Sequence, residues 1–135
     1  MNIQEILHDL RETFGLFEDP KDKFVQLMDM AKESSGLSQT EKIDFNKING
    51  CTSQAWIVVE PSSNNTYTFK VDSDALIVKG LLRILEKVFS NQPVNEILEI
   101  TSNDILSAIG LENIITNQRT NGFESAVNKV HSLIK

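Results

Sequence analysis

The stretch AWIVV at residues 55–59 and the stretch TYTFKV at residues 66–71 decide the fold, because their pattern differs from the rest of the chain. Both are rich in β-branched and aromatic residues, and the second alternates polar with apolar positions, which is typical of strands. Turn-forming residues 61–65 separate them, and Asn49-Gly50, a strong hairpin signal, precedes them. The pattern predicts a small antiparallel sheet of two strands, or of three if residues 45–48 are also extended.

Apolar residues recur at helical spacing on both sides of this sheet. Residues 75–89 are apolar nearly all round, which predicts a buried central helix. Further helices are predicted over residues 2–14, from Asp19-Pro20 to Ser34, over 94–98, over 103–109 with Ser102 as the cap, and from Thr120-Asn121 onward. The expected fold class is α+β, with helices packed on a small sheet in a single domain, residues 1–135.

The chain is acidic, with 19 Asp and Glu against 13 Lys and Arg and a net charge of −6. The surplus lies in residues 1–44, which hold ten acidic and five basic side chains, whereas residues 45–80 hold three of each. A nucleic-acid-binding face needs a basic surplus, so no nucleic-acid partner is expected. No apolar run approaches the roughly 18 residues of a membrane span. The N-terminus lacks a secretory signal pattern, so a cytoplasmic location without a membrane partner is expected.

Cys51 is the only cysteine, which excludes an internal disulfide. The other soft ligands are two scattered histidines, His8 and His131, so no metal site is expected, and both histidines are expected to be solvated. The sequence has no Gly-rich phosphate loop, no His-Glu metal helix and no nucleophile elbow. Cys51 is therefore the residue on which a chemical function can be based.

The position of Cys51 by itself supports two interpretations. A free cysteine is usually an inert, buried small hydrophobe. However, Cys51 follows the Asn49-Gly50 turn and precedes the polar residues 52–54, where no apolar pattern requires a hydrophobe. Lys47 is the only charge from residue 45 to residue 59, so no neighbouring acid disfavours a thiolate. Without a second cysteine a dithiol cycle is excluded, but sulfur exchange with another molecule is not.

Three blocks of the sequence resemble the SufE sulfur-acceptor family. Residues 49–58, NGCTSQAWIV, look like its G-C-x-S-Q-x-W motif, and residues 72–81, DSDALIVKGL, look like its D-S-D-A-x-I-V-K-G-L motif. Gly110-Leu111, followed by RTNGF at residues 119–123, resembles its G-L … R-x-N-G element. Order and spacing agree over essentially the whole chain. Residues 112–118 depart from the pattern, because they lack a histidine that many members carry there.

The resemblance implies a three-stranded antiparallel sheet packed with helices, similar to the IscU-type scaffold. It implies that Cys51 accepts persulfide sulfur from a SufS-type cysteine desulfurase and that the protein stimulates this enzyme. The sulfur would pass on to an iron–sulfur scaffold such as a SufBCD-type complex. The protein would carry no cofactor of its own, because the pyridoxal phosphate belongs to the desulfurase. It would act as a sulfur-transfer accessory protein rather than as a stand-alone enzyme.

Residues of the matching motifs receive expected roles on the same basis. Three residues around Cys51 are expected to support its loop: Gly50, Ser53 and Gln54. Three others are expected to contact the partner: Arg119, Asp74 and Lys79. Simpler interpretations exist, since Ser73 and Asp74 can cap the central helix and Arg119 can be a solvated charge before the last helix. Trp56 is expected in the core.

Three alternatives stay open at the level of sequence. A pure regulator would dock on the desulfurase without carrying sulfur, and Cys51→Ser would then retain the stimulation. A CsdE-type paralogue would serve another sulfur pathway with the same motifs. A thiol-based redox enzyme or peroxidase is disfavoured, because neither a resolving cysteine nor a neighbouring base accompanies Cys51.

Overall fold

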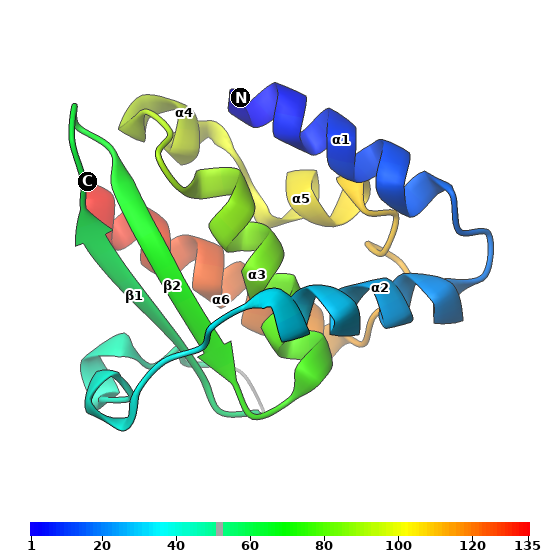
Figure 1. Ribbon diagram of the computed structural model, residues 1–135, viewed down its shortest axis with the longest axis horizontal. Coiled ribbons are helices and arrows are strands. Elements are labelled where there is room, and N and C mark those ends of the chain that lie inside the picture. The colour runs from blue at the N-terminus through cyan, green and yellow to red at the C-terminus, as the bar shows by residue number, and fades with distance from the viewer. Residues whose placement is uncertain (51–52) are drawn as a thin grey trace.

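A computed structural model describes residues 1–50 and 53–135, and Figure 1 shows the arrangement of the helices and strands. In chain order the elements are α1 (Ile3–Gly15), α2 (Pro20–Glu33), the 3₁₀ turns η1 (Gln39–Glu41) and η2 (Asp44–Asn46), β1 (Ala55–Pro61), β2 (Tyr67–Ser73), α3 (Leu76–Phe89), α4 (Val94–Glu99), α5 (Ser102–Ala108) and α6 (Asn117–Ile134). Helices precede and follow one small sheet, so the predicted α+β class is confirmed.

The two strands pair antiparallel, in a register that places Ile57 opposite Val71. Successive side chains of a strand point to opposite faces of the sheet. The inner face packs against α3 and α6 and carries the buried Ala55, Ile57, Phe69 and Val71. The outer face carries Trp56, Val58, Lys70 and Asp72. The alternation predicted from the sequence therefore separates a core face from a face with charged groups.

The third strand implied by the resemblance is present only as a single bridge. Lys47 pairs with Trp56, and the Ile48 N–H donates to the Ala55 carbonyl at 2.8 Å. Directly before this bridge, η2 curls the backbone into a 3₁₀ turn, so the preceding residues cannot lengthen the ladder. Among the described residues the sheet has two strands, and the segment before the Cys51 loop runs beside them.

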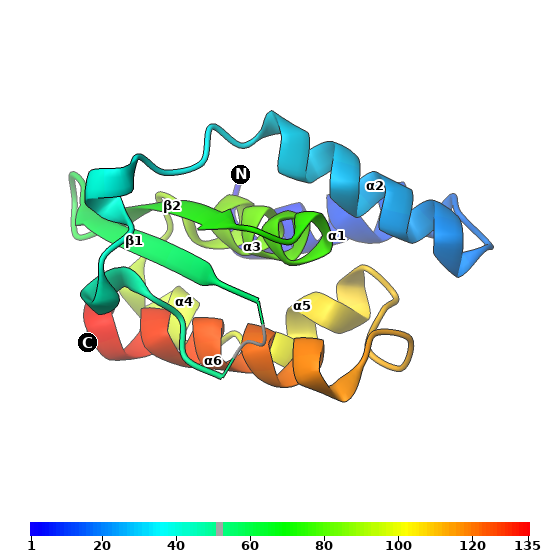
Figure 2. The ribbon, with the colours of Figure 1, turned by 90° about the horizontal axis from the view of Figure 1, so that it is seen from below.

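Helix α3 is the central helix, as its apolar sequence predicts. It contacts α1, α2, α6 and β2, and Figure 2 shows it between α2 on one side and α6 on the other. Gly80 allows the close approach of α2, because a Cβ at this position would overlap the carbonyl oxygen of Leu27. The helix that follows the Cys51 loop and the sheet is thus fixed on several sides.

The first part of the connection between α2 and β1, residues 34–46, crosses the outer face of the sheet (Figure 2), and we call it the connector. The Leu37 N–H donates to Asp72 Oδ2 at 3.0 Å. Lys42 Nζ lies 3.3 Å from the same oxygen and 5.1 Å from the centroid of the Trp56 ring. Trp56 is buried beneath these contacts, as predicted. The connector therefore closes the side of the sheet that no helix covers.

Two helix starts differ from the predicted ones. Thr101 rather than Ser102 caps α5. Helix α6 begins at Asn117, capped by Thr116, whose hydroxyl accepts from the Arg119 N–H at 3.3 Å. The start of α6 at Asn117 is not visible in the sequence, because residues 116–121 are polar and show no apolar periodicity. Arg119 consequently lies in the first turn of α6 and not before the helix.

Candidate functional site

Gln54, three residues after Cys51, is held by the backbone and side chains of the D-S-D motif. The Gln54 N–H donates to Asp74 Oδ1 at 3.1 Å, and the Asp74 N–H donates to the Gln54 carbonyl at 3.2 Å. The Ser73 hydroxyl donates to the same carbonyl at 2.8 Å. We call Ser73, Asp74 and Gln54 the Gln54 clamp. It joins two motifs that lie about 20 residues apart.

The predicted capping of α3 by the side chains of Ser73 and Asp74 differs from what the structure shows. The N-cap residue of this helix is Ala75, which makes no side-chain capping bond. The Ser73 hydroxyl does accept from the Ala75 N–H at 3.2 Å, just before the first helical turn. The Asp74 carboxylate turns instead to the loop end at Gln54. Asp74 therefore binds Gln54 instead of capping α3, because strand pairing brings residue 54 beside residue 74.

Asp72 lies next to the clamp and is a buried charged residue. Oδ1 accepts from the Ser73 N–H at 2.8 Å, and Oδ2 accepts from the Leu37 N–H at 3.0 Å. The ammonium groups of Lys42 and Lys79 lie 3.3 and 3.5 Å from the carboxylate. Burial acts to raise the pKa of Asp72, but these hydrogen bonds and lysines outweigh it and hold the pKa below its ordinary value. Lys79 thus has an internal partner, and its contact with another protein stays a prediction.

The backbone at Gly50, directly before Cys51 in the sequence, lies close to Ser125 of α6. Its φ of +90° lies in the left-handed region that favours glycine. A Cβ at this position would lie 2.8 Å from Ser125 Oγ. Both observations require a residue without a side chain, which fits the predicted loop-supporting role of Gly50. Ser125 was not among the predicted site residues, since a serine in a polar stretch of helix carries no signal in sequence.

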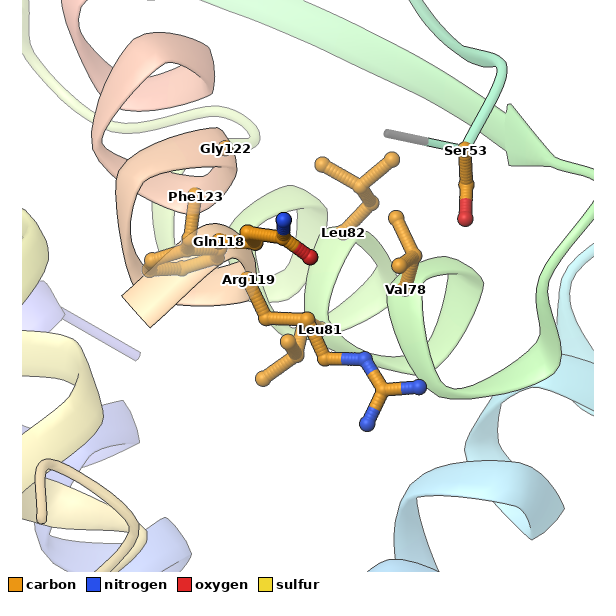
Figure 3. Close-up of a pocket in the computed structure, with 8 residues that line it drawn as sticks. All are labelled: Ser53, Val78, Leu81, Leu82, Gln118, Arg119, Gly122 and Phe123. Carbon is orange, nitrogen blue, oxygen red and sulfur yellow. The ribbon is translucent and has the colours of Figure 1, made fainter. Parts of the chain in front are cut away.

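A small pocket lies between the first turns of α3 and α6, beside Ser53 (Figure 3). Its volume of about 20 Å³ is room for about one water molecule. The described residues that line it are Ser53, Val78, Leu81, Leu82, Gln118, Arg119, Gly122 and Phe123. Six of these eight belong to the three blocks that resemble SufE motifs, and the other two directly adjoin a block. The fold therefore gathers all three blocks around one pocket.

Arg119 brings a positive charge to this mainly apolar pocket. Figure 3 shows its side chain extending from α6 past Leu81 toward the beginning of α3. Within residues 1–50 and 53–135, no carboxylate lies within 4.0 Å of its guanidinium group. Arg119 therefore lies at the pocket, and its contact with a partner and its alternative as a solvated charge both stay predictions.

The structure brings most of the predicted site residues together. Gly50, Gln54 and Asp74 make the loop contacts described above, whereas Ser53 lines the pocket. Cys51 lies outside the described residues, so its predicted role as sulfur acceptor rests on sequence. The prediction missed Asp72 and the apolar pocket residues, because apolar positions in a helix are ordinarily assigned to the core.

The two histidines do not line the pocket. His8 is exposed and its Nε2 lies 3.0 Å from Glu12 Oε1, as expected of a solvated residue. His131 contradicts that expectation, because it is partly buried and its Nε2 lies 2.9 Å from the Ile97 carbonyl oxygen. Among the described residues, no three His, Asp or Glu side chains gather as a metal site. No helix in the same ranges is long and apolar enough to cross a membrane.

Fold and site together define a small α+β protein in which Gln54, three residues after the chain's only cysteine, is held by the D-S-D motif, and Ser53 beside it lines an apolar pocket with one arginine. The SufE family, described as an Fe-S metabolism associated domain, matches residues 8–134. The chain belongs to this family. Membership supports a sulfur-acceptor role in iron–sulfur metabolism, in which cysteine desulfurases take part.

Individual relatives agree with this assignment. Uncharacterized SufE-like proteins of Rhizobium etli and Rhizobium meliloti are 32% and 30% identical, over 96% and 93% of this chain and 89% and 92% of their own lengths. SufE-like protein 1 of Arabidopsis thaliana, described as chloroplastic/mitochondrial, is 36% identical over 89% of this chain but only 33% of its own length. A hypothetical protein of Thermus thermophilus shares the fold, with a TM-score of 0.76, 16% identity and coverage of 96% of this chain and 93% of its own.

Proposed function

We propose that this protein is a sulfur carrier for a SufS-type cysteine desulfurase and that Cys51 is its sulfur acceptor. The Cys51 thiolate attacks the outer sulfur of the persulfide on the desulfurase. A new S–S bond forms on Cys51, the S–S bond of the donor breaks, and the donor cysteine leaves with the electron pair. No net oxidation occurs. The pyridoxal phosphate that generates the donor persulfide belongs to the desulfurase, and the carrier needs no cofactor.

The observation that carries this proposal is the meeting of the three motif blocks around one pocket. Ser53 comes from the block that contains Cys51, Val78 from the D-S-D block, and Arg119 from the third block. Residues that are distant in sequence but gather at one place are expected to serve one site. Ser53 is two residues after Cys51 in the sequence, so the block that carries the only cysteine contributes a residue to that site.

The walls and the charge of the pocket are compatible with a sulfur carrier. Its apolar walls, among them Leu81 and Phe123, would exclude water and other thiols from a persulfide. Arg119 adds a positive charge that favours the thiolate and persulfide anions over their neutral forms.

Incubation with a SufS-type desulfurase and free cysteine, followed by mass spectrometry of the intact carrier, tests the proposal. We expect a mass increase of one sulfur atom, removable by a reducing agent and located on Cys51 by peptide mapping. Cys51→Ser is the matched control and should show no increase. A desulfurase without its own active-site cysteine should load neither protein. Absence of the increase from wild-type protein with an active desulfurase would overturn the proposal.

The same reagents separate a carrier from a docking regulator. A carrier in which Cys51 is replaced by serine should no longer stimulate desulfurase turnover, whereas a regulator would still do so. The physical reason is that turnover of the desulfurase requires removal of its persulfide by a second nucleophile.

Sulfur transfer from the loaded carrier to a SufBCD-type scaffold, measured with the purified complex, distinguishes the cluster-assembly role from that of a CsdE-type paralogue. A cytoplasmic location is part of the same proposal.

Protection of the thiol is a further part of the proposed function. We expect Cys51 to react more slowly with iodoacetamide in the free protein than in the presence of the desulfurase, because docking must expose the sulfur for transfer. Both rates are measured by mass spectrometry under pseudo-first-order conditions. Equal rates in the two states would contradict protection without affecting the sulfur-loading test.

A further inference from the structure

We infer that Asp72 is a positioning residue, which fixes the Gln54 clamp and thereby the position of Gln54, three residues after Cys51 in the sequence. The inference rests on the proposed function only for its consequence, the delivery of the thiol to a partner. Its structural part concerns Asp72, Ser73, Asp74 and Gln54, all of which are described. Asp72 does not touch the pocket, so any effect on sulfur transfer must pass through its neighbours.

Both carboxylate oxygens of Asp72 have hydrogen-bond donors and cations beside them. Oδ1 accepts from the Ser73 N–H at 2.8 Å and lies 3.5 Å from Lys79 Nζ. Oδ2 accepts from the Leu37 N–H at 3.0 Å and lies 3.3 Å from Lys42 Nζ. A carboxylate that is held by two backbone donors and two cations has little freedom to rotate. Asp72 therefore imposes a fixed orientation on the Ser73 peptide.

Ser73 connects Asp72 to Gln54. The Ser73 hydroxyl donates to the Gln54 carbonyl, and the Asp74 N–H donates to the same oxygen. The return bond, from the Gln54 N–H to Asp74 Oδ1, completes the Gln54 clamp. A rotation of the Ser73 peptide would move both the hydroxyl and the next N–H relative to Gln54. The two groups that hold the loop end thus depend on the bond between Asp72 and Ser73.

The residues around Asp72 accommodate a carboxylate at this position. Gly36 has a φ of +70°, and a Cβ at that position would lie 2.9 Å from Asp72 Oδ2. The absence of a side chain at Gly36 allows the Leu37 N–H to reach the carboxylate. Lys42 and Lys79 would be left without their shared anion if the carboxylate were removed. Asp72, on β2, therefore contacts residues of both the connector and α3.

A neighbouring ion pair provides a matched control. Lys70 lies two residues before Asp72 on the same face of β2, and its Nζ lies 2.8 Å from Glu41 Oε2 in the connector. This pair also fastens the connector to the sheet. However, it shares no hydrogen bond with the Gln54 clamp. Glu41→Gln therefore weakens the connector without acting on the peptide of Ser73.

The test is amide hydrogen exchange measured by NMR on wild type, Asp72→Asn and Glu41→Gln, under conditions in which each protein is folded. The Gln54 and Asp74 amides should exchange about tenfold faster in Asp72→Asn. This is the change expected when local opening of the structure becomes easier by the contribution of about one hydrogen bond. In Glu41→Gln the same two amides should stay within about twofold of wild type. The buried Ile84 amide of α3 serves as the reference for global unfolding in all three proteins.

Lys79→Met is the second variant, needed if Asp72→Asn does not fold. It leaves the carboxylate and Lys42 in place but removes the cation from Oδ1, the oxygen that binds Ser73. We expect faster exchange at Gln54 and Asp74, by about threefold, with Ile84 unchanged. Equal exchange at Gln54 in wild type and in the folded variants, or equal acceleration in Glu41→Gln, would overturn the inference.

A kinetic measurement connects the clamp to function. Because Asp72 is buried, its replacement should leave the KM of the desulfurase for the carrier within about twofold while lowering the kcat of sulfur transfer. A rise in KM without a change in kcat would mean that the substitution disturbs the docking surface, which contradicts a positioning role. If neither wild type nor variant accepts sulfur, the proposed function fails, while the exchange experiment still decides the role of Asp72.

Discussion

Gln54 and Asp74 bind each other in both directions: the Gln54 N–H donates to Asp74 Oδ1 at 3.1 Å and the Asp74 N–H donates to the Gln54 carbonyl at 3.2 Å. The two residues lie 20 positions apart and belong to different sequence motifs. Their reciprocal bonding extends the strand pairing by one step beyond the end of the sheet. It thereby links Gln54, three residues after Cys51 in the sequence, to the residues that lead into α3.

Replacement of Asp74 by alanine should loosen the loop without unfolding the protein. The variant loses the bond to the exposed Gln54 N–H but retains the backbone bond in the other direction, so we expect about 0.5–1 kcal/mol less stability in urea unfolding. Alkylation of Cys51 by iodoacetamide should become faster. Glu99→Ala, at another exposed acid, is the control and should change neither quantity. An unchanged alkylation rate in Asp74→Ala would refute the loop contact as a constraint on the thiol.

Gly50→Ala should destabilise the protein through two separable causes. Its φ of +90° is unfavourable for alanine, at a cost of about 1–2 kcal/mol. In addition, the new Cβ would meet Ser125 Oγ at 2.8 Å. The double variant Gly50→Ala/Ser125→Ala should recover only the contact part, so a double-mutant cycle from chemical denaturation should show a favourable coupling. If the free-energy changes of the two single substitutions simply add, the Ser125 side chain moves aside at no measurable cost in stability.

Gly80→Ala should be among the more destabilising glycine substitutions in the described part of the chain. The methyl group would collide with the backbone of Leu27, which cannot rotate away, so α2 and α3 must separate; about 1–3 kcal/mol is expected. Gly15→Ala is the matched control, since nothing lies within 4 Å of its Cβ position near the end of α1. That substitution should be neutral or slightly stabilising. Thermal melting of both variants provides the comparison.

The stability contributed by Asp72 should depend on pH in a defined direction. Its pKa in the folded protein lies below the ordinary value of 3.8, so its contribution is fully present above that value and is lost as the pH falls through the folded pKa. Asparagine does not titrate. The difference in unfolding free energy between wild type and Asp72→Asn should therefore be constant near neutral pH and shrink below about pH 4. A difference that grows on acidification would contradict the ionised carboxylate.

Arg119→Gln should impair cooperation with the desulfurase but not folding. Within the described residues its guanidinium has no carboxylate partner, so the melting temperature should change little. The stimulated turnover should fall, because the pocket loses its positive charge. Arg11→Gln on α1, at a cation that does not line this pocket, is the control and should behave like wild type. Equal stimulation by wild type and Arg119→Gln would show that Arg119 has no role in the response of the desulfurase.

The parts of the fold that follow from local physical chemistry were predictable. The two strands and the central helix α3 each have an apolar pattern that matches their burial, so their existence and approximate bounds are confirmed. The helix start at Asn117 was not predictable, because a polar cap followed by a polar first turn leaves no periodic signal. The single bridge at Lys47 likewise depends on a neighbouring strand that sequence patterns do not specify.

The sequence by itself determined that one thiol is available, that a strand pair and a buried helix follow it, and that three SufE-like blocks occur in order. These are properties of residue identity and of periodicity along the chain. Only the tertiary structure decided that Ser53, Val78 and Arg119 line one pocket, and that Asp74 holds Gln54 rather than capping α3. The physical reason is that a polar side chain near a helix start has several donors within reach, and the packing of strands and helices decides which of them it meets.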